Sequence, residues 1–149
     1  MRGAGRLTIA VAVIALALVS VAVAASTPAV YRKQASTVCS ATNSLLNAVP
    51  KPTKTSQIES FLNKDLVIFH AQLKKLETLT PPRSLKALHL KALAWETLEL
   101  AAIQQLVDKI HGGTPPETAF NSLSKKLTTL AKSESAVWKK LKIKSCAAQ

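Results

Sequence analysis

Helix-breaking residues divide most of this 149-residue chain into four segments, and each segment carries apolar side chains at the spacing of an amphipathic helix. The breaks are prolines and glycines at residues 50–52, 81–82 and 112–113, because neither residue type continues a helix well. Linkers this short make consecutive helices antiparallel neighbours. The pattern therefore predicts an all-α fold, an up-down-up-down four-helix bundle.

The ends of these segments carry local signals. Residues 27–28 predict the start of the first helix, with a threonine cap and a proline in the first turn. Residues 56–59 and 114–117 each match a capping box, in which a hydroxyl and a glutamate side chain bond free amide groups at a helix start. Over residues 139–146 apolar side chains alternate with lysines. That alternation predicts an extended tail, which would double back along the first helix.

Residues 1–25 have the composition of a secretory signal helix. Arg2 and Arg6 give a positive start, residues 7–25 carry no charge, and residues 22–24 match the small-residue pattern at which signal peptidase cleaves. We therefore expect a secreted or extracytoplasmic protein, with the signal at 1–25 and the four-helix bundle domain at 26–149. The alternative is an uncleaved membrane anchor, because about 20 apolar residues can span a bilayer. In that case residues 7–25 are the chain's contact with the membrane.

The chain has two cysteines, Cys39 and Cys146, one near each end of the predicted domain. An isolated pair in an exported protein is most simply a disulfide. The up-down-up-down topology places the start of the first helix and the end of the last helix at the same end of the bundle. We therefore predict a Cys39–Cys146 disulfide.

Positive charge is in excess over the whole chain and is densest in the last segment. Without Arg2 and Arg6 the formal charge falls from +12 to +10, which predicts attraction to anionic partners. Five lysines opposite the apolar seam of the last segment form what we call the lysine ridge: Lys125, Lys126, Lys132, Lys139 and Lys140. Such a run is often only a solvated helix face. The ridge has no arginine and no aromatic side chain, so specific nucleic-acid recognition is not expected.

Five ionisable side chains project onto apolar helix faces: Asp65, His89, Glu96, Glu99 and Glu134. Carboxylates and histidines inside a four-helix bundle are the ligands of di-iron proteins, which use Glu-x-x-His on two helices. Neither Glu96 nor Glu99 has a histidine three residues on. These five residues are the alternative metal or small-ligand set, and the simpler interpretation is that they reach solvent or pair with lysine and arginine stems.

Glu134 is the one charged residue that interrupts the heptad seam of the last segment, between Leu130 and Val137. A carboxylate that faces a dry core needs a partner. His89 is the favoured candidate, and a lysine or arginine is the alternative. A Glu134–His89 pair would act as a pH-sensitive lock, because histidine titrates near neutrality.

The order of these features resembles small exported helical proteins of high-GC Gram-positive bacteria. The shared features are a cysteine followed by an Asn- and Leu-containing helix at residues 39–46, the Leu-Glu-Thr-Leu-Thr-Pro-Pro break at 76–82, a downstream His89 and a cysteine near the terminus. The resemblance implies an extracytoplasmic location and a bundle fold, and it implies no activity and no functional residues.

The sequence contains no serine-hydrolase, haem-attachment or nucleotide-binding motif. We therefore expect no enzymatic activity and no cofactor. The predicted function is a non-enzymatic extracytoplasmic binding or structural module that associates with anionic envelope components or an acidic protein. The alternative is a small-ligand or metal-binding helical bundle.

Overall fold

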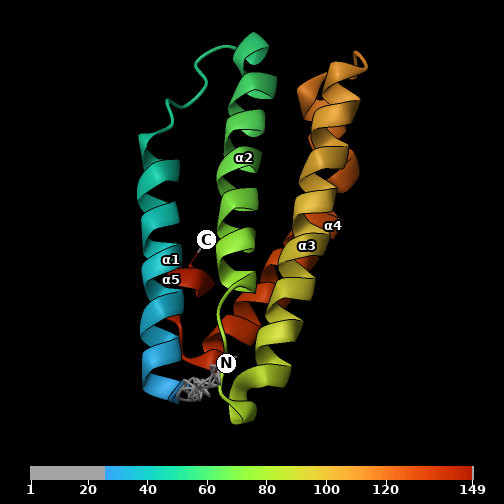
Figure 1. Cartoon of the computed structure of the whole chain (residues 1–149). Coiled ribbons are helices and arrows are strands. Elements are labelled where there is room, and N and C mark those ends of the chain that lie inside the picture. The colour runs from blue at the N-terminus through green and yellow to red at the C-terminus, as the bar shows by residue number, and fades with distance from the viewer. Residues whose placement is uncertain (1–25, 149) are drawn as a thin grey trace, which may run out of the picture.

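The computed structural model describes residues 26–148, so the predicted signal at 1–25 lies outside the described residues. The described chain is all-helical. Its elements are α1 (Pro28–Ala48), the 3₁₀ turn η1 (Thr55–Gln57), α2 (Ile58–Glu77), α3 (Arg83–His111), α4 (Pro116–Leu141) and α5 (Lys144–Ala147). The four long helices alternate in direction along the chain (Figure 1). The prediction of an up-down-up-down four-helix bundle is confirmed.

Of the three predicted helix starts, only the first is capped as expected. The Thr27 hydroxyl accepts a hydrogen bond from the Val30 amide at 3.3 Å. At α2 the predicted capping box is wrong, because the side chain of Gln57 accepts from the Thr53 and Lys54 amides and α2 begins after it. At α4 the capping box is also wrong. That helix begins at Pro116 with Pro115 as its N-cap residue. Neither proline has an amide hydrogen to cap, and no side chain bonds the N-terminus of the helix.

The extended tail predicted for residues 139–146 is wrong as well. Helix α4 continues to Leu141, and Lys142 adopts a left-handed conformation with φ 61° that ends it. The Lys142 amide bonds the Lys139 carbonyl and the Ile143 amide bonds the Trp138 carbonyl, which together form a Schellman motif. The apolar residues and lysines that alternate over residues 139–146 therefore form the end of α4, the turn after it and the start of α5, and the apolar side chains among them are buried.

The C-terminal segment does double back along α1, as predicted. Helix α5 lies against α1 (Figure 1). The hydroxyls of Ser36 and Ser145 are hydrogen-bonded at 3.0 Å. Cys39 and Cys146 form a disulfide with a Cα–Cα distance of 5.1 Å, and both residues are buried. The predicted disulfide is confirmed, and it fixes α5 to α1.

The core runs along the bundle in three groups of buried side chains. The largest surrounds Trp138 and Leu141 of α4 and includes Tyr31 of α1 and Leu76 of α2. A second group joins α2 to α3, and a third joins α3 to α4. Because α1 packs mainly on α2 and α5, the short C-terminal helix completes the enclosure of the core on that side.

Candidate functional site

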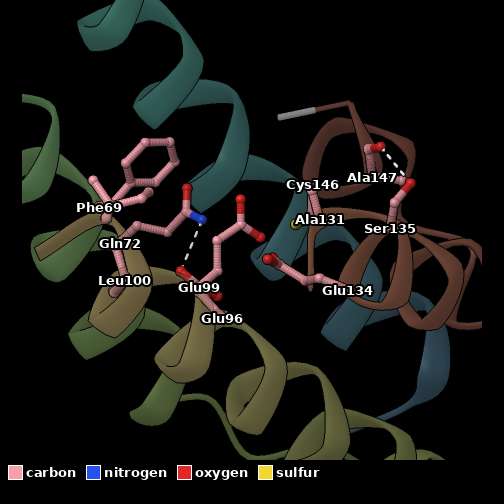
Figure 2. A pocket seen from close by; sticks show the side chains of 11 residues that line it. Phe69, Gln72, Glu96, Glu99, Leu100, Ala131, Glu134, Ser135, Cys146 and Ala147 are labelled. Carbon is pink, nitrogen blue, oxygen red and sulfur yellow. Dashed lines mark hydrogen bonds between the residues drawn. The ribbon is translucent and has the colours of Figure 1, made fainter. Parts of the chain in front are cut away.

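A small pocket with a volume of about 40 Å³ lies where α2, α3, α4 and α5 meet (Figure 2). Its walls are largely apolar, and three glutamates and one glutamine project into it. The lining residues are Phe69, Gln72, Glu96, Glu99, Leu100, Ile103, Ala131, Glu134, Ser135, Cys146 and Ala147. We call Glu96, Glu99 and Glu134 the carboxyl cluster.

Glu96 is the most buried member of the cluster, with 3% of its surface exposed. Its Oε1 accepts a hydrogen bond from Nε2 of Gln72 at 3.0 Å (Figure 2). Its Oε2 is buried and has no hydrogen-bond partner. Burial raises the pKa of Glu96 to about 7. The Gln72 bond opposes this shift, and the charges of Glu99 and Glu77 add to it. A substantial fraction of Glu96 is therefore protonated near neutral pH.

Glu134 faces Glu99 across the pocket (Figure 2). Its Oε1 accepts a hydrogen bond from Nε1 of Trp138 at 2.9 Å. Burial is the largest cause that raises the pKa of Glu134 to about 9. The hydrogen bond with Glu99 raises it further, and the Trp138 bond lowers it. A hydrogen bond between two carboxyl groups needs a proton on one of them. With its pKa raised to about 9, Glu134 is the group that carries this proton at neutral pH.

The predicted pairing of Glu134 with His89 is wrong. Nδ1 of His89 is hydrogen-bonded to the Tyr31 hydroxyl at 2.8 Å, and the two rings meet edge to face. Burial lowers the pKa of His89 and raises the pKa of Tyr31 to about 12, so both side chains are neutral at pH 7. Trp138 lies four residues after Glu134, on the same helix face, and supplies the donor that was assigned to His89.

The five-residue metal or small-ligand set is therefore only partly assembled. The pocket brings together Glu96, Glu99 and Glu134, whereas His89 and Asp65 are not among its lining residues. Asp65 is half-buried, its Oδ1 has no hydrogen-bond partner, and burial raises its pKa. Within residues 26–148 no group of three or more His, Cys, Asp or Glu side chains is arranged to hold a metal ion.

The sequence analysis missed three residues that shape this site, namely Gln72, Trp138 and Phe69. Gln72 is 1% exposed, and it lies three residues after Phe69 and four before Leu76, on the apolar face of α2. A polar residue inside an apolar stripe is the signal that could have identified it. Such a residue must find a partner when it is buried.

The lysine ridge is a solvent-exposed surface on α4. All five ridge lysines are exposed. Lys126 donates a hydrogen bond to the Gln105 side chain at 3.3 Å. In the part of the chain that the structure describes, the one ion pair joins His111 to Glu59 at 2.9 Å. No carboxylate in that part therefore neutralises a ridge lysine by direct contact.

Two further observations bear on function. None of the helices over residues 26–148 combines the length and the apolar character that crossing a membrane requires. Comparison of the chain with protein-family models, with curated proteins and with solved structures found no match. The resemblance to exported proteins of high-GC Gram-positive bacteria therefore stays a prediction.

Proposed function

We propose that the protein is a non-enzymatic extracytoplasmic binding or structural module that associates with anionic components of the cell envelope through the lysine ridge. The observation that supports this proposal is the exposure of all five ridge lysines together with the lack of any direct carboxylate partner for them in the described chain. Ammonium groups in this state remain available to phosphate or carboxylate groups of a partner surface.

The charge balance supports the same proposal. The chain has 20 basic and 8 acidic residues. Two of those acids, Glu96 and Glu134, are buried and have pKa values raised to about 7 and about 9. Their protonation removes negative charge at neutral pH, so the positive excess is larger than the formal charge implies.

The cysteine pair supports the extracytoplasmic location in this proposal. Disulfides persist in oxidising compartments outside the cytoplasm, and the bond between Cys39 and Cys146 is fully buried in the bundle. A buried structural disulfide of this kind fits an exported protein.

Vesicle binding tests the proposal. The protein should sediment with vesicles that contain phosphatidylglycerol and not with pure phosphatidylcholine vesicles. The bound fraction should fall as salt rises to 0.15 M, where screening acts over about 8 Å. The triple variant Lys125→Gln, Lys132→Gln, Lys139→Gln should bind on the order of 100-fold more weakly, at about 1 kcal/mol per lysine near an anionic surface.

A second triple variant gives a matched control with the same net charge. Lys51, Lys64 and Lys74 are exposed and lie on the linker and on α2, away from the ridge. Replacing these three with glutamine should weaken binding much less than the ridge variant does. Equal losses in both variants would show that net charge, and not the ridge, carries the attraction. Binding that neither variant reduces would refute the proposal.

Small-ligand binding is a second candidate function, and the pocket is the observation that favours it. Three carboxyl groups and an apolar wall line one cavity, and one buried oxygen of Glu96 has no partner. Only three of the five residues in the predicted metal set line this pocket, and no three such side chains in residues 26–148 are arranged to hold a metal ion. The candidate ligand is therefore a small organic molecule.

A further inference from the structure

We propose that the carboxyl cluster binds a small organic cation, a primary ammonium group on a short apolar stem. This inference rests on the second proposed function, small-ligand binding, and assigns its ligand class. Three features of the pocket support it, and the ligand must match all three. They are the unpartnered oxygen of Glu96, the three carboxyl groups that line the pocket, and the apolar walls.

The buried oxygen calls for a hydrogen-bond donor. Oε2 of Glu96 has no partner in a residue that is 97% buried, and Glu96 projects into the pocket (Figure 2). Leaving a buried acceptor unpaired costs about 1–3 kcal/mol, and more when the group is charged. A ligand that donates a hydrogen bond at this point removes that cost.

The three carboxyl groups select the charge of the donor. Glu96 and Glu99 project from α3, and Glu134 projects toward them from α4 (Figure 2). This cluster would repel an anion. A neutral donor would not balance the negative charge of an ionised carboxyl group. A primary ammonium carries one positive charge and three donors, which matches three carboxyl groups that converge on one space.

The geometry favours an organic cation over a metal ion. Metal ions bind carboxylate oxygens at about 2.0–2.6 Å and need them tightly clustered. Within residues 26–148 no three His, Cys, Asp or Glu side chains are arranged to hold a metal ion. An ammonium nitrogen accepts longer contacts of about 2.7–2.9 Å to carboxylate oxygens. It therefore does not need the tight clustering that a metal ion requires.

The walls set the size and the stem of the ligand. Phe69, Leu100 and Ile103 supply an apolar surface next to the carboxyl groups, and Ala131 and Ala147 leave room beside Glu134. A water molecule needs about 10–15 Å³ of such space, so a pocket of about 40 Å³ holds a group of a few heavy atoms. This fits an ammonium head with one or two methylene groups, and the rest of the stem would lie at the mouth.

Binding of a cation should release protons. The titratable groups that face the pocket are Glu96 and Glu99 from α3 and Glu134 from α4, and Glu77 of α2 acts on Glu96 through its charge. Helix α5 contributes Cys146, which is disulfide-bonded, and Ala147. An ammonium group takes the place of the protons that the carboxyl groups hold. Its affinity should therefore increase from pH 5 to pH 8.

Isothermal titration with n-butylammonium chloride at 0.15 M salt tests this proposal, with n-butanol and sodium butyrate as the neutral and anionic analogues. Wild-type protein should bind n-butylammonium saturably and more tightly than either analogue. The titration heat should depend on the buffer in the way that proton release requires. The variant Glu96→Gln should bind about tenfold or more weakly, because it loses a charged hydrogen-bond partner.

The control variant is Glu117→Gln, which removes an exposed acid in the first turn of α4 and should leave binding unchanged. If Glu96→Gln loses helix content by circular dichroism, Glu99→Gln replaces it, because Glu99 is only half-buried and its loss perturbs the core less. Wild-type affinity in a folded pocket variant would overturn the assignment to the carboxyl cluster.

The analogues separate the ligand class from the proposed function. If n-butanol or butyrate binds as tightly as n-butylammonium, the cationic class is wrong and small-ligand binding stands. If none of the three binds, both the class and the second proposed function are refuted. Either result leaves the lysine-ridge proposal to be judged by its own vesicle test.

Discussion

The free energy of unfolding should fall as the pH rises from about 4.5 to about 9. Glu96 and Glu134 each have a pKa raised from the ordinary value of 4.5, to about 7 and about 9 respectively, mainly through burial. The folded state therefore binds protons more tightly than the unfolded chain. The stabilising effect of protonation is fully present below about pH 4.5, and it is lost as the pH rises through the folded-state values.

Glu96 gives the magnitude of this effect. When the pKa of Glu96 rises from 4.5 in the unfolded chain to about 7 in the folded protein, the free energy of unfolding is lower by about 3 kcal/mol at high pH than at low pH, at 1.36 kcal/mol per pKa unit. That is a large part of the 5–15 kcal/mol that holds a typical domain folded. Glu134 extends the same trend to about pH 9.

Urea unfolding followed by circular dichroism, at intervals between pH 4.5 and 9.5, measures the effect. Other groups titrate over this range, so the comparison is made against Glu96→Gln and Glu134→Gln, whose amides stay neutral and can still accept hydrogen bonds. Each variant should lose less stability than wild type as the pH rises, whereas the exposed-site control Glu117→Gln should follow wild type. Identical pH profiles for all four proteins would refute the reasoning.

Two further experiments test the buried hydrogen bonds. Tyr31→Phe leaves Nδ1 of buried His89 without its partner, so it should destabilise the protein by about 1–3 kcal/mol in urea unfolding. His89→Ala should then cost much less in the Tyr31→Phe background than in wild type, because the bond between the two side chains is already lost. Glu134→Leu continues the heptad seam, but it leaves Nε1 of fully buried Trp138 unpaired. It should therefore destabilise the protein at pH 5 and less at pH 9, where about half of wild-type Glu134 is charged; equal effects at both pH values would contradict this account.

The fold was predictable because the helix-breaking residues and the helical spacing of the apolar residues indicate the same four segments. Prolines and glycines at residues 50–52, 81–82 and 112–113 each fall between observed helices. Short linkers leave few alternatives to antiparallel neighbours. Periodicity also identified most of the buried seam of α4, including Leu130, Val137 and Leu141. These are local properties, and a single sequence carries them directly.

Details that depend on one side chain reaching a particular atom were not predictable in the same way. Gln57 satisfies the linker amides ahead of α2, although the sequence pattern pointed to a capping box over residues 56–59. Lys142 takes a left-handed conformation that glycine usually supplies at a helix end. Without a glycine there, the alternation over residues 139–146 pointed to an extended tail.

The sequence predicted three of the site's glutamates but not their hydrogen-bond partners. Helical projection placed Glu96, Glu99 and Glu134 on apolar faces, and the structure brings those three to one pocket. Projection gives each helix its own apolar face, but it does not give the rotation of one helix against the next. The partner of Glu134 was therefore sought across the bundle at His89, when a donor was available one turn away at Trp138.

The disulfide and the carboxyl cluster are linked because Cys146 and Ala147 form a wall of the pocket. Helix α5 has four residues, too few to be stable alone. Besides the disulfide, its ties include the Ser36–Ser145 bond and the bond from the Ser135 hydroxyl to the Ala147 carbonyl. If the disulfide is removed, this wall should loosen. Water should then reach Glu96 and Glu134 and bring their pKa values closer to 4.5.

Two effects of removing the disulfide can be separated by pH. Loss of the cross-link over 107 residues costs up to about 4–5 kcal/mol through the unfolded state, and this part does not depend on pH. Loosening of the wall relieves the burial of charged Glu134, so it offsets part of that cost at high pH only. The double variant Cys39→Ser, Cys146→Ser carries no thiol that titrates. It should therefore lose more stability relative to wild type at pH 5 than at pH 9, measured by urea unfolding at both values. A loss of equal size at the two pH values would mean that α5 keeps its place without the disulfide and that the bond does not control access to the carboxyl cluster.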